Sequence, residues 1–418
     1  MWTLGQAEEY LLGLELFGMR FGLDRMRRLM TVLGLPQRRF ESIHVVGTNG
    51  KSSTVRFTAA ILERHGVRTG SYTSPHLRSF RERVEVGEAP VSEQDFAAAV
   101  EQAAHAAGLV DRTADPDDVV TQFEALTAAA YHELARQEVE VAVIEAGLGG
   151  RYDATNVIPS RVQVLTGIDL EHTRWLGPRI EDIAEEKLAV VRDGATLVAP
   201  PDLDPAASAV AERVARERGA RLVLAPPADD TGVDLRAAGS FQRANFALAA
   251  AAAEAFLGRA LDPAAVAAAG SETRVAGRMD VVGQDPLTIY DGAHNPSGAD
   301  ALAASIDDAL GGRSPRVAVI GVLEDKDAAA MLRALLPRFD HVVFTRLANP
   351  RALPPATLMS LAEKLAPAVP AEAAPDPRAA LERARTVAGP GGAVLATGSI
   401  YLIADLLRED PDARASTL

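Results

Sequence analysis

Short apolar runs rich in β-branched residues alternate, in the first half of the chain, with longer stretches whose apolar side chains recur at helical spacing. The runs predict strands at 43–46, 68–74, 139–147, 161–168 and 194–200. The helical spacing predicts intervening helices, the clearest of them at 7–35, 51–65, 92–107, 121–137 and 179–192. Strands that alternate with helices are typical of a mostly parallel sheet covered by helices on both faces.

A second alternation of the same kind follows a junction at 271–286. It predicts strands at 287–292, 316–322, 341–345 and 392–399, and helices at 297–309, 327–336, 355–366 and 377–387. Because 418 residues exceed one ordinary core, we expect two domains. The first, over 1–272, is a large α/β domain with a P-loop-type, mostly parallel sheet, and the second, over 273–418, is a smaller Rossmann-like α/β domain.

Three segments are expected to lack regular structure. The stretches 225–234 and 366–378 are rich in alanine, proline and aspartate and are predicted to be loops. The final segment, REDPDARASTL, is predicted to be frayed.

Composition narrows the class of protein. The net charge of −14 and the pI near 5.1 argue against a broad surface for nucleic acid or for an acidic membrane. The absence of cysteine excludes disulfides, zinc fingers and thiol catalysis. The chain has no apolar run of 18 residues, and its first residues do not open a signal peptide. We expect a cytoplasmic protein, a monomer by default, with small-molecule partners.

The basic residues are biased toward arginine. Only four of the 43 are lysines, namely Lys51, Lys187, Lys326 and Lys364. Arginine supplies neither a compact point charge nor a nucleophilic amine, so a lysine kept in such a chain is expected to be there for its amine. Lys364, in the helical segment LAEKLA, is instead predicted to lie on a solvated helix face.

The segment IHVVGTNGKSSTV, at 43–55, has the composition of a phosphate-binding loop. Glycines let the backbone approach phosphate oxygens, a helix N-terminus favours negative charge, and Lys51 would neutralise it. The spacing departs from Gly-x-x-x-x-Gly-Lys-Ser/Thr, because Val45 stands at the first glycine position and Gly47 comes two residues later. The alternative is a plain strand, turn and helix with a surface lysine.

Polar residues stand at the carboxyl ends of other predicted strands, where parallel sheets bind ligands. Ser74 and Glu145 follow two of these strands, and either can ligate a hard cation. A turn serine and a capping or ion-paired glutamate are the alternatives. A further strand leads to Asp169, Glu171 and His172, although a lone histidine is more often structural. Together these residues predict an ATP–Mg²⁺ site, in a kinase, a GTPase-like switch or an ATP-driven ligase.

The second predicted domain favours a ligase. Its segment YDGAHNP again places Asp291, His294 and Asn295 at a strand end. A site built from two domains suits a reaction that joins ATP to two further substrates.

These motifs together resemble the folylpolyglutamate synthase/dihydrofolate synthase family of the Mur ligase superfamily. HVVGTNGKSS is similar to the family's HVAGTNGKGS, whose shortened loop accounts for the glycine spacing. The segments EAGLGGRYDATN, EHTRWLG, IAEEK, GRMD, DGAHNP and ATGSIYLI follow in the family's order, over almost the whole chain. The resemblance implies an ATP-binding Mur-ligase-like domain followed by a glutamate-ligase domain.

The resemblance also implies roles for residues of the first domain. Ser74 and Glu145 would bind Mg²⁺, and His172 a second Mg²⁺. Lys187 would be carbamylated by CO₂ and help to organise the metal site, which requires an amine that arginine cannot supply. The ATP phosphates would be held by Thr48, Asn49, Gly50, Lys51, Ser52 and Ser53. Of all these residues, Lys51, Lys187 and His172 would take part in catalysis.

Four residues beyond these loops complete the implied nucleotide site. Asn245, Arg278 and Asp291 would contact ATP across the domain junction, with His294 nearby. The sequence departs from the family at Ser52, where glycine is usual, and in the LAVVRDG that follows IAEEK. Glu171 also stands where aspartate is usual, so neither it nor Asp169 is included in the expected site.

The implied reaction is ATP-driven amide formation through an acyl phosphate, with L-glutamate as the attacking amine. The acceptor carboxylate belongs either to dihydropteroate or to the glutamyl tail of a folate, and the sequence does not separate these activities. Arg81 and Arg83 are either anion contacts or ordinary surface charges. The competing functions are another Mur ligase acting on cell-wall precursors and a nucleotide-hydrolysing switch.

Overall fold

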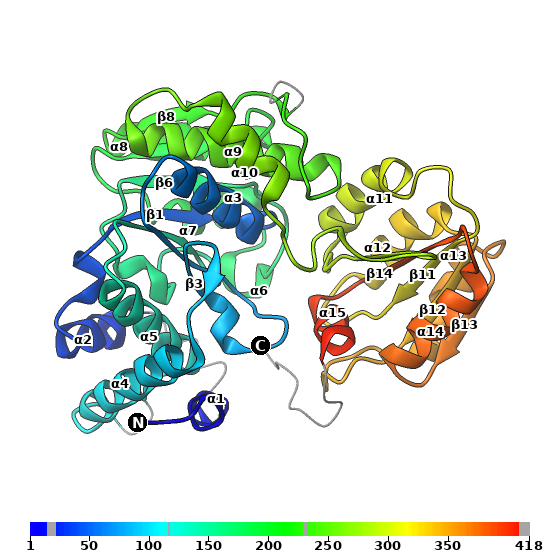
Figure 1. Ribbon diagram of the computed structural model, residues 1–418, viewed down its shortest axis with the longest axis horizontal. Coiled ribbons are helices and arrows are strands. Elements are labelled where there is room, and N and C mark those ends of the chain that lie inside the picture. Colours follow the sequence, from blue (N-terminus) through cyan, green and yellow to red (C-terminus); the bar gives the residue numbers. More distant parts are fainter. Residues whose placement is uncertain (15–21, 116–117, 229–231, 409–418) are drawn as a thin grey trace. The chain divides into compact units, whose positions relative to one another are not determined.

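The computed structural model divides the chain into two compact units (Figure 1). Unit 1 contains Met1–Asp234 and Ala244–Gly270, and unit 2 contains Leu235–Arg243 and Ser271–Leu418. Within these units the structure describes residues 1–14, 22–115, 118–228 and 232–408.

Unit 1 is built on an eight-stranded sheet in the order β4-β3-β2-β5-β1-β6-β7-β8. The strands β2, β5, β1, β6, β7 and β8 run parallel to one another. Strands β3 and β4 pair antiparallel at the edge beside β2. Their bounds are β1 (Glu41–Val46), β2 (Thr69–Tyr72), β3 (Val84–Val86), β4 (Ala89–Pro90), β5 (Val141–Glu145), β6 (Val162–Leu165), β7 (Thr196–Ala199) and β8 (Arg221–Leu224).

Helices of unit 1 pack on this sheet and on one another. Helix α3 packs against β1, β2 and β5, and α4 lies along α5 (Figure 1). The helices are α1 (Leu4–Gly13), α2 (Asp24–Val32), α3 (Lys51–Arg64), α4 (Glu93–Asp111), α5 (Gln122–Arg136), α6 (Thr173–Leu176), α7 (Ile180–Leu188) and α8 (Pro205–Glu217). Short 3₁₀ turns lie at η1 (Pro36–Arg38), η2 (Phe80–Arg83) and η3 (Ala154–Val157). Helices α9 (Ser240–Leu257) and α10 (Pro263–Glu272) contain residues of both units.

The central strands are buried on both faces, which is why they appear in the sequence as continuous apolar runs. All five residues of β5 are buried, including the terminal Glu145, and β1 is buried from Ser42 to Val46. Alternate residues Ala142 and Ile144 join a core cluster with α4 and α5. The N-terminus of α5 is stabilised by a capping box, in which the Thr121 side chain accepts the Glu124 N–H and the Glu124 carboxylate accepts the Thr121 N–H.

Unit 2 has a six-stranded sheet in the order β13-β12-β11-β14-β10-β9, parallel except for the edge strand β9. Its strands are β9 (Asp280–Gln284), β10 (Leu287–Tyr290), β11 (Arg316–Ile320), β12 (His341–Thr345), β13 (Ala371–Ala374) and β14 (Ala393–Thr397). Its helices are α11 (Pro296–Leu310), α12 (Ala328–Leu335), α13 (Pro355–Leu365), α14 (Pro377–Ala388) and α15 (Ile400–Leu407), with a 3₁₀ turn η5 (Leu336–Arg338). The two sheets confirm the predicted α/β fold class.

Two local predictions need correction. The stretch 7–35 is not one continuous helix, because α1 ends at Gly13 and Leu14 has an extended backbone. Residues 15–21 of that stretch lie outside the described residues. The predicted loop 366–378 contains β13, an edge strand that pairs with β12 alone. Its alanines and glutamate have low strand propensity, so the residues themselves do not reveal the strand.

Of the other segments expected to be irregular, 225–234 is described except for 229–231, and the final segment is described at Arg408 alone.

Candidate active site

The phosphate-loop segment connects β1 to α3, as the sequence predicts. Gly47 has φ +150° and Gly50 has φ +84°, backbone angles that favour glycine. A Cβ on Gly47 would lie 1.9 Å from the Thr166 Oγ1 atom, and one on Gly50 would lie 2.3 Å from the Asn245 Oδ1 atom. The position of Gly47, two residues later than in the usual pattern, is therefore fixed by the close approach of Thr166.

Two lysine amines converge on one carbonyl of this loop. The Lys51 Nζ atom donates to the Gly47 oxygen at 3.2 Å and to the Thr48 oxygen at 3.1 Å. The Lys187 Nζ atom, from α7, donates to the same Gly47 oxygen at 2.7 Å. Helix α3 begins at Lys51, and the first N–H groups of a helix have no partner within the helix, which favours binding of an anion there.

Lys187 is not the solvated helix lysine that its polar neighbours would suggest, since its exposed fraction is 5%. Burial lowers its pKa to about 7, and the positive charge of Lys51 adds to the effect. Near neutral pH a large share of the amine is therefore unprotonated, which a nucleophilic amine requires.

Glu145 and Ser74 lie next to each other at the carboxyl ends of neighbouring strands. The Ser74 backbone N–H donates to the Glu145 Oε2 atom at 3.1 Å, and the Glu145 residue is 2% exposed. A carboxylate buried at a strand end, beside a serine, is a donor set that suits a hard cation. Glu145 is the last residue of β5, which is the strand-end position that the sequence predicts.

His172 lies on the segment after β6. It precedes α6 with φ +53°, and its side chain is 40% exposed. Its Nε2 atom is 3.9 Å from a carboxylate oxygen of Glu171. The order β2-β5-β1-β6 places the segments that carry Ser74, Glu145, Lys51 and His172 at the carboxyl ends of four consecutive strands.

The described part of the chain has no group of three His, Asp or Glu side chains that could hold a metal ion. The predicted metal set contributes two such side chains, Glu145 and His172, and a serine hydroxyl. The remaining ligands would therefore have to come from phosphate oxygens, water or a carbamate.

The predicted residues of unit 2 gather around the start of the DGAHNP segment. The Asp291 carboxylate, 3% exposed, accepts bonds from the backbone N–H groups of Met279 at 2.9 Å and Ala293 at 2.8 Å. Burial raises the pKa of Asp291, and the charge of Arg278 opposes the rise. The His294 Nδ1 atom bonds the Gly292 carbonyl at 2.9 Å. Asp291 thus fastens GRMD to DGAHNP, and its contact with ATP stays a prediction.

Several residues that the sequence left undecided or unnoticed have clear places. Arg83 is 1% exposed and donates to His76 Nδ1 at 3.0 Å, so the surface-charge alternative is wrong for it. Thr166, which the sequence reading did not include, donates to the Asn49 carbonyl oxygen at 2.5 Å. The only sequence feature that could have identified Thr166 is its position near the carboxyl end of the predicted strand 161–168, directly after the point where β6 ends.

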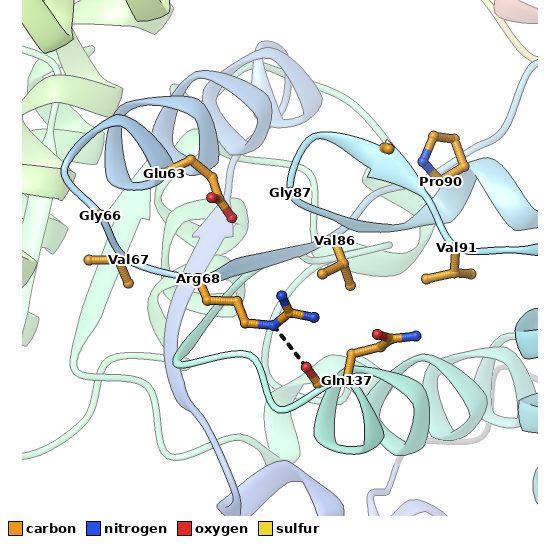
Figure 2. A pocket seen from close by; sticks show the side chains of 10 residues that line it. Glu63, Gly66, Val67, Arg68, Val86, Gly87, Pro90, Val91 and Gln137 are labelled. Carbon is orange, nitrogen blue, oxygen red and sulfur yellow. Dashed lines mark hydrogen bonds between the residues drawn. The ribbon is translucent and has the colours of Figure 1, made fainter.

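A cavity of about 520 Å³ lies away from these residues (Figure 2). Arg68 lines it, with its Nε atom donating to the Gln137 carbonyl at 2.9 Å. Arg68 precedes β2, whereas Ser74 follows it, so this cavity lies at the opposite end of the strand from the predicted metal site. It contains none of the predicted site residues. No helix among the described residues is long and apolar enough to cross a membrane.

Comparisons with known proteins match both the sequence and the fold of this chain. The model of the Mur ligase, glutamate ligase domain matches residues 277–400. The dihydrofolate synthase/folylpolyglutamate synthase of Mycobacterium tuberculosis is 36% identical over 373 residues, which cover 79% of this chain and 75% of that protein.

Solved structures extend the likeness to almost the whole chain. The M. tuberculosis folylpolyglutamate synthase complexed with ADP has a TM-score of 0.89 and 32% identity, over 96% of this chain and 97% of that one. A bifunctional folylpolyglutamate synthase/dihydrofolate synthase with Mn, AMPPNP and L-glutamate bound has a TM-score of 0.82 and 30% identity, over 97% and 98%. The chain belongs to the folylpolyglutamate synthase/dihydrofolate synthase family.

Proposed function

We propose that the protein is an ATP-dependent ligase that adds L-glutamate to a folate. The observation that carries this proposal is the phosphate loop, in which the Lys51 and Lys187 amines share the Gly47 carbonyl. The family relationship makes folate the acceptor class and disfavours cell-wall precursors, and the buried amine of Lys187 distinguishes the site from that of a simple nucleotide switch.

The nucleotide phosphates would lie over the loop and the start of α3. The glycines leave room for close approach of the phosphates, the helix N-terminus favours their charge, and Lys51 would exchange its carbonyl partners for phosphate oxygens. The loop residues that we assign to this role are Thr48, Asn49, Gly50, Lys51, Ser52 and Ser53. We assign Asn245, Arg278, Asp291 and His294 to the same nucleotide site.

One Mg²⁺ would be held by Ser74 and Glu145, and a second by His172. When bound, these ions would neutralise charge on the phosphates. We also propose that Lys187 reacts with CO₂ to form a carbamate. The reaction joins the neutral amine nitrogen to the CO₂ carbon and releases one proton. The buried position and a pKa of about 7 supply that neutral amine.

The reaction would proceed in two steps. The folate carboxylate attacks the γ-phosphorus of ATP, ADP leaves, and an acyl phosphate forms. The neutral amine of L-glutamate attacks the acyl carbon, phosphate leaves, and an amide bond and one proton result. Lys51 and Arg278 would offset negative charge where the anions meet. The test uses a substrate whose carboxylate oxygens are labelled with ¹⁸O. An acyl phosphate transfers one labelled oxygen to the released phosphate, so unlabelled phosphate would refute this intermediate.

We assign the nucleotide chemistry to a first domain over 1–272 and the glutamate-ligase role to a second over 273–418. The match of the glutamate ligase domain model at 277–400 supports the latter. We further propose a cytoplasmic monomer whose partners are small molecules, with no nucleic acid, in keeping with the net charge of −14. Light scattering after gel filtration tests the monomer.

The decisive experiment is ADP release by the purified protein with Mg²⁺, ATP and L-glutamate. Dihydropteroate is the acceptor in one series and tetrahydrofolate in the other, and mass spectrometry identifies the products. Turnover with both acceptors makes the enzyme bifunctional, and turnover with tetrahydrofolate alone makes it a tail-lengthening synthase. A protein that binds ATP but turns over neither acceptor would refute the proposal.

A further inference from the structure

The phosphate loop is joined to the segment that follows β6 by hydrogen bonds over a separation of about 120 residues along the chain. The Thr166 N–H donates to the Val46 oxygen at 2.9 Å, and the Thr48 N–H donates to the Gly167 oxygen at 2.9 Å. The Asp169 N–H donates to the Thr48 Oγ1 atom at 3.1 Å. The Thr166 Oγ1 atom donates to the Asn49 carbonyl oxygen at 2.5 Å, its shorter contact, and lies 3.4 Å from the Val46 carbonyl oxygen.

The bond to the Asn49 carbonyl oxygen fixes the orientation of one peptide group. The Asn49 carbonyl and the Gly50 N–H belong to the same planar trans peptide, so they point in opposite directions. With the carbonyl held toward Thr166, the Gly50 N–H points away from Thr166. Gly50 immediately precedes α3, whose first N–H groups are those expected to face phosphate.

The same peptide is the one in this loop most prone to turn over. Gly50 has φ +84°, and glycine populates positive and negative φ with similar ease. A peptide that precedes a glycine can therefore rotate at little cost and present its carbonyl where its N–H had been. A carbonyl oxygen that faced a phosphate would repel it, so the loop needs an interaction that selects one orientation.

We propose that Thr166 is a positioning residue for nucleotide binding, whose hydroxyl holds the Asn49–Gly50 peptide so that its N–H is available to a phosphate. The proposal rests on the nucleotide site proposed above. Thr166 itself would not contact ATP, and it is not one of the loop residues assigned above to phosphate binding. The hydroxyl also fills the space beside Gly47, where a Cβ would lie 1.9 Å from Oγ1.

The test compares variants that differ in this hydroxyl. Thr166→Val keeps the shape and removes the donor, Thr166→Ser keeps the donor, and Thr166→Ala differs from the serine variant by one oxygen atom. Thr58→Val is the matched control, because its buried hydroxyl donates to the Thr54 carbonyl at 2.7 Å within α3. The affinity for ADP is measured by titration calorimetry, and KM is measured separately for ATP and L-glutamate.

We expect Thr166→Val and Thr166→Ala to bind ADP about 10-fold more weakly than the native protein, within the range expected when a buried carbonyl loses its donor. KM for ATP should rise with little change in KM for L-glutamate. Thr166→Ser should bind within about twofold of the native protein, and so should Thr58→Val. A crystal structure of the valine variant should show the 49–50 peptide turned over.

The outcomes separate the two proposals. If the native protein fails to bind ADP, the proposed function itself is wrong, and the inference fails with it. If the native protein binds ADP and Thr166→Val binds equally well, the positioning role is refuted. Equal weakening in the serine and alanine variants also refutes it, because the hydroxyl would then be irrelevant. Should the valine variant not fold, the serine and alanine pair makes the same comparison.

Discussion

Replacing Lys187 tests whether the active site depends on a neutral, carbamylated amine. At pH 7.5, a pKa of about 7 leaves about three quarters of the amines neutral. An exposed lysine with a pKa near 10.4 would be about 0.1% neutral, so the buried site offers roughly 600 times more reactive amine. Lys187→Met keeps the buried volume and removes the nitrogen. We expect it to lower turnover by about 10- to 100-fold, as loss of a group that orients metal ligands does.

The assay is ¹³C NMR of the native protein under ¹³CO₂ at a fixed concentration of dissolved gas. We expect one carbamate signal, which is absent from Lys187→Met and retained in Lys364→Met, since Lys364 is exposed on α13. Between pH 7.5 and 9 the signal should form at a nearly constant rate, because most of the amine is already neutral. Activity should fall in CO₂-free buffer and return when bicarbonate is added.

Two results would refute this reasoning. An active native protein without a ¹³C signal at saturating CO₂ would show that Lys187 works as a free amine. A formation rate that climbs about tenfold per pH unit up to pH 9 would show that the pKa of Lys187 is not lowered.

Three further predictions follow from the same structure. Glu145→Gln should abolish Mg²⁺-dependent ADP release while circular dichroism stays native, because an amide oxygen can still accept the Ser74 N–H but ligates the cation poorly; retained turnover would exclude Glu145 as a ligand. Gly70→Ala should lower the free energy of unfolding by about 1–3 kcal/mol in urea titrations, since its Cβ would lie 2.4 Å from a Leu134 methyl carbon; an unchanged midpoint would show that Leu134 moves aside. In CO₂-free buffer, the free energy of unfolding should rise by about 2 kcal/mol from pH 7 to 9, because over this range Lys187 is protonated in the unfolded chain and loses its proton in the folded protein. Lys187→Met should remove that rise.

Much of the site follows from the sequence because parallel strands bring their carboxyl ends to one edge of a sheet. The apolar run before Glu145 identifies a buried strand, so a carboxylate at its end must face the ligand edge rather than solvent. The same reasoning places Ser74 after β2 and the glycine loop after β1. To predict that these segments lie together, the sequence lacked only the order of the strands in the sheet. Alternating strands and helices allow few such orders.

The remainder depends on contacts that no local pattern encodes. Thr166 lies 117 positions from Asn49 along the chain, and a threonine after a strand has many ordinary uses. The burial of Lys187 depends on how α7 packs, and its own segment has the polar character of a solvated helix face. Strand β13 was not predicted because its residues have little preference for strands, and it forms by pairing with β12, which lies elsewhere in the sequence.

The unusual glycine spacing acquires a physical meaning from these contacts. Gly47 must lack a side chain because the Thr166 hydroxyl occupies that space, and its carbonyl is the acceptor for both Lys51 and Lys187. Two cationic amines that share one neutral acceptor repel each other, which favours loss of a proton from the more deeply buried one. If phosphate drew Lys51 away, as the proposed function requires, Lys187 would keep the carbonyl. On the proposed function, the shortened loop would serve two tasks at once, since it would cradle an anion and hold a neutral amine beside it.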